Sequence, residues 1–252
     1  MRTSIRELVP EYIRELAPYV PGRPIEEVER ALKATAIKLA SNENPLGPSP
    51  LAIEAAKKAL QGSNRYPDGS GFYLRQALAK KHEIPAETII LGGGSTELID
   101  LSARMVLRPA DCGVTSYGSF PLYYIAIRAT GARFVEVPHR DYHFDLDAMA
   151  GFLPPETKII FLANPNNPTG TMFDADELDR FLARIPEHVL VVLDEAYCDY
   201  VDHPNYSRSI GLVRGGRNII VLRTFSKVYG LAGLRIGYGV GPAELLEEVF
   251  PE

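Results

Sequence analysis

Two basic residues late in the chain have types and a spacing that suit a chemical site. Lys227 and Arg235 stand eight residues apart around a group of small residues, and a lysine held in such a place can form a Schiff base. The apolar run at 218–222 predicts that Lys227 lies just past the carboxyl end of a central strand, where open α/β sheets bind ligands. The other interpretation is a solvated loop lysine.

A glycine-rich turn follows another apolar run. Residues 92–94 are all glycine and come directly after the run at 88–91, and Ser95 and Thr96 open a helical pattern. The free N–H groups and the dipole of such a helix suit a phosphate. An ordinary turn with Ser95 or Thr96 as its cap is the alternative interpretation.

Polar residues follow two further apolar runs. Asp194 ends the run at 189–193 and would lose its hydration unless it met a positive partner, such as a protonated pyridine nitrogen. A helix-capping aspartate is the alternative. The segment at 164–170, after the run at 158–163, carries amide side chains whose directions are fixed by two prolines. A plain turn does not need so many asparagine and proline residues.

The elements that must position these residues follow from the same runs. The four runs are continuously apolar, which is typical of parallel strands covered on both faces, and residues 235–241 predict one more strand. Helical patterns lie between them. Asp174 with Glu177 predicts one helix start, and Ser49-Pro50 predicts another. We expect the second helix to turn these residues inward: Leu51, Ala55, Ala59 and Leu60. The order predicts an α/β fold with a mostly parallel, doubly wound sheet.

Residues 1–45 differ from the rest of the chain. They are rich in proline and contain one short amphipathic helix with Ile25, Val28 and Leu32 on one face. We therefore expect an N-terminal arm at 1–45, and the α/β domain at 46–252.

Composition excludes several classes of protein. The 252 residues are 46% hydrophobic and 23% charged, with a net charge of -5. No basic block could follow a nucleic acid or an anionic membrane, and no apolar run resembles a membrane span or a signal peptide. We expect a cytoplasmic protein that binds small molecules. Two distant cysteines make no disulfide framework, and His139 with His143 is interpreted as a polar surface connection and not as a metal site.

Together, the sequences at the strand ends resemble a known family. The series at 164–170, 194–197, 224–227 and 233–238, with 39–48 and 64–68 before it, is similar to the fold type I aminotransferases that use pyridoxal phosphate, and most of all to their histidinol-phosphate aminotransferase branch. The resemblance extends over nearly the whole chain in the correct order.

The resemblance implies roles around the cofactor ring. Lys227 would hold pyridoxal phosphate covalently and then act as the base that moves the substrate proton. Asp194 would keep the ring nitrogen protonated, so that the ring accepts electrons. Tyr197 and Asn167 would bond to the ring hydroxyl oxygen, and Phe120 would lie against the ring face.

It also implies a phosphate site and a partner. Ser95, Thr96, Ser226 and Arg235 would hold the phosphate, with Arg235 supplying a two-pronged contact. Tyr66 would reach the phosphate across a two-fold interface, which implies a homodimer.

The implied reaction is transamination of histidinol phosphate with 2-oxoglutarate in histidine biosynthesis. Transamination of aromatic amino acids and decarboxylation of phosphothreonine are the alternatives within this chemistry. Family members are longer, so we expect 46–252 to be the large cofactor-binding domain, 1–45 to include part of a small domain, and the C-terminal part of that small domain to be missing. On that expectation turnover is weak, and a non-catalytic fragment or dimerisation module remains the alternative of another class.

Overall fold

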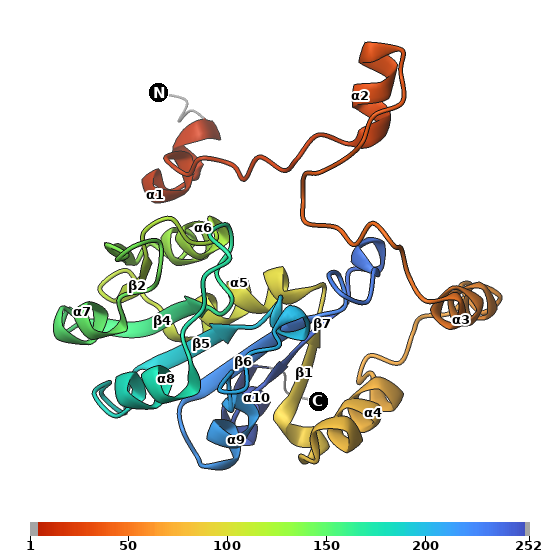
Figure 1. Ribbon diagram of the computed structural model, residues 1–252. Helices are drawn as coiled ribbons and strands as arrows, with labels where there is room; N and C mark the ends of the chain where they lie inside the picture. Colours follow the sequence, from red (N-terminus) through yellow and green to blue (C-terminus); the bar gives the residue numbers. More distant parts are fainter. Residues whose placement is uncertain (1–4, 250–252) are drawn as a thin grey trace.

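The computed structural model describes residues 5–249. Within that range, seven strands form a single sheet in the order β1-β7-β6-β5-β4-β2-β3 (Figure 1). The strands are β1 (Ile89–Gly92), β2 (Cys112–Ser116), β3 (Arg133–Val137), β4 (Thr157–Ala163), β5 (Leu190–Asp194), β6 (Ile219–Thr224) and β7 (Gly237–Val240). All four apolar runs are strands, and so is the additional strand expected at 235–241.

The sheet is mixed, with one reversed strand. Pairings between β3, β2, β4, β5 and β6 are parallel, whereas β7 runs antiparallel to both β6 and β1. Because β1 is reversed twice relative to β6, it points the same way as the other five strands. Its carboxyl end therefore lies on the same edge of the sheet as theirs, as the sequence predicts, although its only sheet neighbour among the described residues is antiparallel.

Helices cover both faces of the sheet, and the strand order decides which face each one takes. Crossovers between parallel strands are right-handed, so reversing the direction of travel across the sheet moves the helix to the other face. The steps β1 to β2 and β2 to β3 run one way, while those from β3 to β4, β5 and β6 run back. The first group of helices is α5 (Ser95–Val106) and α6 (Leu122–Ala129), and the second is α7 (Leu146–Gly151), α8 (Ala175–Leu182) and α9 (Ser209–Arg214). Contacts between α5 and α6 and between α7 and α8 agree with this division.

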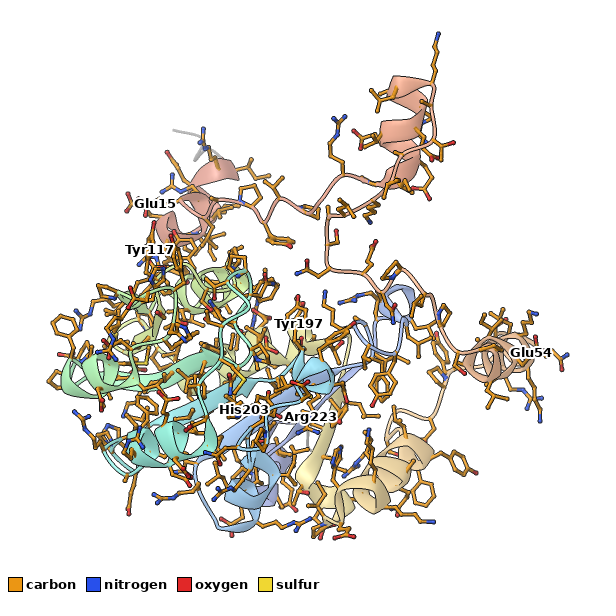
Figure 2. The ribbon with its side chains drawn as sticks, in the orientation of Figure 1. Glu15, Glu54, Tyr117, Tyr197, His203 and Arg223 are labelled. Carbon is orange, nitrogen blue, oxygen red and sulfur yellow. The ribbon has the colours of Figure 1, made fainter. Side chains whose placement is uncertain are left out.

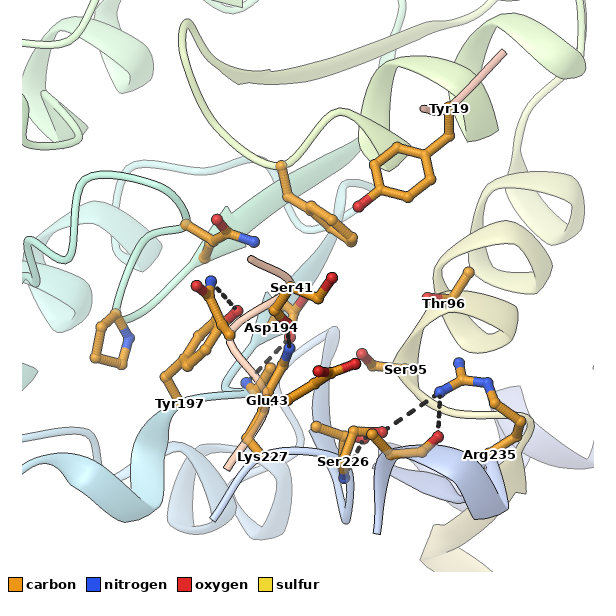
Figure 3. A pocket seen from close by; sticks show the side chains of 18 of the residues that line it. Tyr19, Ser41, Glu43, Ser95, Thr96, Asp194, Tyr197, Ser226, Lys227 and Arg235 are labelled. Atoms are coloured by element: carbon orange, nitrogen blue, oxygen red, sulfur yellow. Dashed lines mark hydrogen bonds between the residues drawn. The ribbon is translucent and has the colours of Figure 1, made fainter. Parts of the chain in front are cut away.

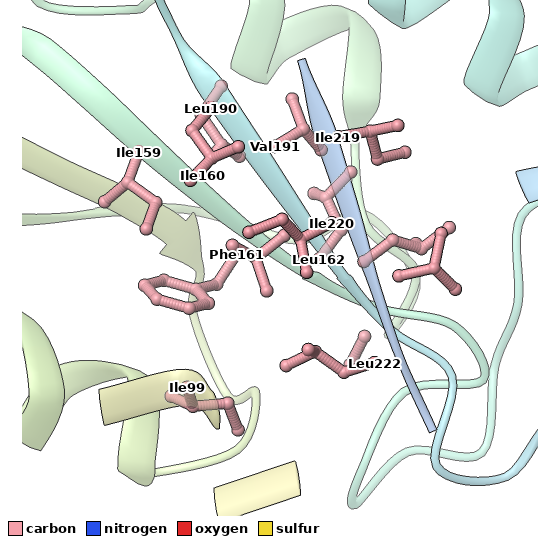
Figure 4. Packing of buried hydrophobic residues seen from close by; sticks show 14 of the residues in the cluster. Ile99, Ile159, Ile160, Phe161, Leu162, Leu190, Val191, Ile219, Ile220 and Leu222 are labelled. Carbon is pink, nitrogen blue, oxygen red and sulfur yellow. The ribbon is translucent and has the colours of Figure 1, made fainter. Parts of the chain in front are cut away.

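The core lies in the central strands. All five residues of β5 are buried, and Phe161, Leu193 and Ile219 from three neighbouring strands have no exposed surface (Figure 4). Burial on both faces explains why these runs are continuously apolar instead of alternating. The helix start predicted at Asp174 is confirmed, since Asp174 and Glu177 form a reciprocal capping box at α8.

Part of the chain before β1 lies outside this body. Figure 1 shows α2 (Ile25–Leu32) and α3 (Pro50–Leu60) away from the sheet, whereas α1 (Glu11–Arg14) packs against α6. An ion pair of 3.7 Å between Glu15 and Arg128 adds to that contact. The remaining elements are η1 (Ile5–Leu8), α4 (Phe72–His82), η2 (Ala86–Thr88), η3 (Cys198–Tyr200), η4 (Ala232–Leu234) and α10 (Ala243–Val249). None of the described helices is long and apolar enough to span a bilayer.

One expectation about α3 is wrong. The helix begins as predicted, with the Ser49 side chain accepting a hydrogen bond from the Leu51 N–H, but its apolar side chains do not turn inward. Leu51 and Leu60 are 83% and 68% exposed, and α3 has no buried residue. Figure 2 shows Glu54 on this helix, standing off the body. Periodicity shows which side chains share a helix face, but not whether another surface covers that face.

Candidate active site

A pocket of about 490 Å³ opens at the carboxyl edge of the sheet. It is where β4, β5 and β6 end and α5 begins, so the segments that sequence reasoning singled out do come together. These predicted site residues line it: Ser95, Thr96, Phe120, Asn167, Asp194, Tyr197, Ser226, Lys227 and Arg235 (Figure 3). Tyr66 does not line it, and its side chain is fully exposed.

Asp194 is a buried carboxyl group at the floor of the pocket. It is 5% exposed and accepts hydrogen bonds from the Tyr123 hydroxyl at 2.9 Å and from the Ala196 N–H at 3.1 Å. Burial raises the pKa of Asp194 to about 6, and these two bonds oppose the rise. No arginine, lysine or histidine within residues 5–249 forms an ion pair with it. The carboxyl group is therefore suited to a cationic or proton-bearing group that enters the pocket.

Tyr123 is a site residue that sequence reasoning missed. It lies on α6, is completely buried, and stacks on Phe161 with ring centroids 5.1 Å apart. Burial and the nearby Asp194 charge raise the pKa of Tyr123 well above its ordinary value, so the hydroxyl keeps its proton and remains a donor.

Lys227 extends into the pocket from the turn after β6. Its Nζ donates a 3.0 Å hydrogen bond to the Ser41 carbonyl and lies 5.3 Å from the Tyr197 ring centroid. Burial lowers the pKa of Lys227, while the Asp194 and Glu43 carboxylates oppose that change. A lower pKa increases the neutral, nucleophilic fraction of the amine, as a Schiff-base lysine needs.

The opposite end of the pocket carries hydrogen-bond donors that could hold an anion. The N-terminal N–H groups of α5, a helix of 12 residues, lie there with the Ser95 hydroxyl. Arg235 reaches the same place: one Nη donates to the Gly93 carbonyl at 3.1 Å and the other lies 3.5 Å from Ser226 Oγ. Arg235 also has a left-handed backbone, with φ of 53°, at the end of η4.

Two glycines allow this close approach. A Cβ on Gly94 would come within 2.6 Å of the Arg235 guanidinium, and φ is +80° there. A Cβ on Gly237 of β7 would come within 2.7 Å of the Ser95 N–H nitrogen and closer still to the Gly94 backbone. Strand β7 therefore presses directly on the start of α5, and side chains at either position would displace the anion site.

The N-terminal arm forms the remaining wall. Asn42 donates a 3.0 Å hydrogen bond to the Tyr197 hydroxyl, and Asn44 donates one of 2.8 Å to the Val228 carbonyl. Tyr19 contributes an edge-on contact to Phe120, with centroids 6.2 Å apart. Sequence reasoning used the segment at 39–48 for resemblance alone and assigned no contact to Asn42. The segment lies on the side of the pocket that holds Lys227 and Tyr197.

In the described part of the chain, no three His, Cys, Asp or Glu residues are grouped so that they could hold a metal ion. The segment with His139 and His143 forms a local turn, in which Arg140 and His143 make an isolated bridge.

The geometry defines a class of protein. A family model described as "Aminotransferase class I and II" matches residues 34–249, and the chain belongs to that family.

Its relatives are more specific. It is 50% identical over 244 residues to the histidinol-phosphate aminotransferase of Anaeromyxobacter sp. (strain Fw109-5), covering 96% of this chain and 67% of the relative. It is 48% identical over 241 residues to the same enzyme of Moorella thermoacetica, covering 95% of this chain and 62% of the relative. The chain therefore spans about two thirds of the length of these relatives.

A solved structure matches the fold. The histidinol-phosphate aminotransferase of Sinorhizobium meliloti, solved in complex with pyridoxal-5'-phosphate, superposes with a TM-score of 0.86 at 32% identity. The match covers 94% of this chain and 64% of that one. The fold is that of the fold type I aminotransferases, as the resemblance in the sequence implied.

Proposed function

We propose that this chain binds pyridoxal 5'-phosphate in the pocket and holds it covalently through the Lys227 amine. The observation that carries the proposal is the arrangement around Asp194: a buried carboxyl group without an ion-pair partner in the described chain lies beside a lysine of lowered pKa. The anion site at the start of α5 lines the same pocket. A protonated pyridine nitrogen would match the Asp194 carboxyl group, and an aldehyde would match the Lys227 amine. A phosphate would match the anion site at the start of α5.

The residues of the chain have separate tasks in this proposal. Bound pyridoxal phosphate supplies an electron sink for the carbanion formed at the substrate Cα. Asp194 keeps the proton on the ring nitrogen, and Lys227 moves the substrate proton as a general base and acid. Tyr197 and Asn167 bond to the ring hydroxyl oxygen, and Phe120 covers one ring face; all three line the pocket.

Phosphate binding is assigned to the opposite end of the pocket. Ser95, Thr96 and Ser226 offer hydroxyl groups there, and Arg235 offers a guanidinium. The Arg235 side chain is held by carbonyl groups and the Ser226 hydroxyl instead of a carboxylate, so its charge is available to an anion.

The proposed reaction is transamination of histidinol phosphate with 2-oxoglutarate, as a step of histidine biosynthesis. The names of the relatives near 50% identity support this substrate over an aromatic amino acid or phosphothreonine. The chain spans about two thirds of the length of those relatives, so we propose this activity for the whole protein. We also propose that residues 1–45 form an arm with part of a small domain, and that residues 46–252 form the cofactor domain.

The proposal includes a cytoplasmic homodimer. Tyr66 is fully exposed and outside the pocket of its own chain, which fits a residue that acts on the pocket of a second copy. Sedimentation of the purified chain, with and without pyridoxal phosphate, measures the association. A monomer under both conditions would remove the role assigned to Tyr66.

Absorption spectroscopy tests the cofactor assignment. Pyridoxal phosphate added to the purified chain is expected to give the visible band of a lysine-bound cofactor, and borohydride reduction should abolish it. Lys227→Ala should not give the band. Lys57→Ala is the matched control, since Lys57 is exposed on α3 and pairs with Glu54. Absence of the band from the unaltered chain would leave the non-catalytic interpretation.

A further inference from the structure

A buried ion pair lies directly behind the pocket. Both Nε and Nη2 of Arg223 donate to Glu195 Oε2, at 3.0 and 2.7 Å. The Glu195 side chain has no exposed surface and that of Arg223 is 19% exposed. Figure 2 shows Arg223 inside the body, below the labelled Tyr197.

The pair ties together the two segments that carry the proposed chemistry. Glu195 follows Asp194 in the chain, and Arg223 stands four residues before Lys227 on the strand that leads to it. The Glu195 N–H also donates to the Leu222 carbonyl at 2.8 Å. Backbone and side chain of Glu195 are thus both attached to consecutive residues of β6, at the point where β5 leaves the sheet.

Glu195 follows the last residue of β5, and its N–H continues the bonding to β6, so its side chain points to the opposite face of the sheet from that of Asp194. Asp194 faces Tyr123 of α6, on one side. The Arg223 side of the sheet holds His82, Cys198 and Tyr238, all of which interact electrostatically with the guanidinium. Because the Glu195 side chain is held on that side, the backbone at residues 194–196 cannot rotate freely. The direction of the Asp194 carboxyl group is therefore fixed as well.

Stability alone explains this pair poorly. Removing two charges from water costs about as much as their attraction returns, so that well-packed apolar residues often replace such a pair without loss. Within the described chain, Glu195 Oε1 is also buried without a hydrogen-bond partner, which adds a desolvation cost. The pair is better explained by what it orients.

We propose that Arg223 is a positioning residue of the cofactor site: through Glu195 it holds the end of β5, and with it the Asp194 carboxyl group, against the part of β6 that carries Lys227. This inference rests on the proposed cofactor function. Arg223 does not line the pocket and acts only through Glu195.

The pKa of the Asp194 carboxyl group is a measure of this positioning in the cofactor-free chain. The carboxyl group accepts hydrogen bonds from the Tyr123 hydroxyl and the Ala196 N–H, and it interacts electrostatically with the Lys227 amine and, across the sheet, with the Glu195 carboxylate. Tyr197 stands close enough to Asp194 to sense its charge. The Tyr123 and Ala196 bonds favour the charged carboxylate. Releasing the end of β5 weakens both bonds, so the pKa of Asp194 should rise above its present value of about 6.

The test uses Arg223→Met and Arg223→Lys. The lysine keeps the charge and loses the two donors on one guanidinium plane. In the cofactor-free chain, the ¹³C resonance of the Asp194 carboxyl group, assigned by its loss in Asp194→Asn, is followed from pH 4 to 8. We expect its titration midpoint to rise by about one pH unit in both variants, as the loss of one such bond implies. Pyridoxal phosphate affinity should fall about tenfold.

The matched control is Arg133→Met, which removes an Arg–Glu pair of 3.2 Å that is more than half exposed and far along the sheet at β3. It should change neither measurement. An unchanged Asp194 midpoint in both Arg223 variants would overturn the inference. Loss of folding in both would also count against it, because the pair would then serve stability. If Arg223→Met alone fails to fold, Arg223→Lys decides.

The two proposals fail in different ways. If the unaltered chain gives no cofactor band, the proposed function is wrong while the titration of Asp194 still measures the positioning. If the band forms and the titration does not respond to Arg223, only the positioning is wrong.

Discussion

The hydroxyl of Tyr123 donates a 2.9 Å hydrogen bond to Oδ2 of Asp194, and both side chains are buried. The bond joins α6 to the end of β5, 71 residues later in the chain. It favours the charged form of an acid whose burial favours the neutral form. Burial outweighs this bond, so the pKa of Asp194 is raised to about 6.

Tyr123→Phe should raise the pKa of Asp194 further. The change removes a bond to a charged group, which is worth about 1.5 to 3 kcal/mol, and thus raises the midpoint by about one pH unit or more. Carbon-13 titration of the cofactor-free chain measures it. Tyr124→Phe is the control on the same helix, since Tyr124 packs against Phe134 at 5.0 Å and not against Asp194. Equal midpoints in the two variants would contradict the expectation.

Asp194→Asn should change how stability depends on pH. Burial raises the folded pKa of Asp194 from 3.8 to about 6, so the folded chain holds this proton more tightly than the unfolded chain does. Stability from this group is present below the unfolded value and is lost as the pH rises through the folded one. The loss is about 3 kcal/mol if the whole shift applies. Urea unfolding between pH 4 and 7 should therefore show a flatter decline in Asp194→Asn.

The comparison must be made against the unaltered chain. Burial lowers the pKa of His82 to about 4, which produces the opposite slope over part of the same range, and the subtraction cancels it. Asp147→Asn, at an exposed residue paired with Arg184, should keep the original slope. If the free energy of unfolding fell as steeply with pH in Asp194→Asn as in the unaltered chain, the Asp194 carboxyl group would not be the cause of the decline.

Arg235→Gln should separate binding of the phosphate from binding of the ring. A charge-assisted contact to phosphate is worth about 1.5 to 3 kcal/mol, so affinity for pyridoxal phosphate should fall by about 10- to 100-fold. Affinity for pyridoxal, which has no phosphate, should change little. Absorption titration gives both constants. Arg104→Gln, at the exposed far end of α5, is the control, and equal losses for the two ligands would remove Arg235 from the phosphate site.

Gly237→Ala should separate β7 from the start of α5. The added Cβ would lie 2.6 Å from the Gly94 carbonyl carbon, a contact that backbone must relieve by moving, at a cost of about 1 to 3 kcal/mol. We expect lower thermal stability and weaker cofactor binding. Gly211→Ala in α9 has nothing within 4 Å of its new Cβ and should be neutral or stabilising. A Gly237 variant as stable as the Gly211 variant would refute the close contact.

Much of the site could be predicted from the sequence because parallel strands end on one edge. Once those runs were interpreted as parallel strands, the residues that follow β4, β5 and β6 were expected at one edge of the sheet. The capping pair Asp174 and Glu177 predicted the start of α8. The prediction located Lys227 and Asp194 in one pocket without any knowledge of side-chain contacts.

Other parts could not be predicted, each for a physical reason. Strands β2 and β3 are short and mixed in polarity, so no apolar run marks them. Tyr123 lies within an ordinary helical pattern, and only tertiary structure brings it to Asp194. The exposed face of α3 was expected to be buried, because a repeat of apolar residues carries no information about what covers it.

The contacts of the arm with the pocket have a consequence for the order of synthesis. Lys227 and Ser41, joined by a hydrogen bond, are 186 residues apart. At about 5 to 20 residues per second on a ribosome, the segment that completes the pocket is made roughly 10 to 40 seconds before its partner exists. Throughout that interval the Ser41 carbonyl lacks the Lys227 amine that it binds in the folded chain. The first segment of the site to be synthesised is therefore among the last to gain its contacts.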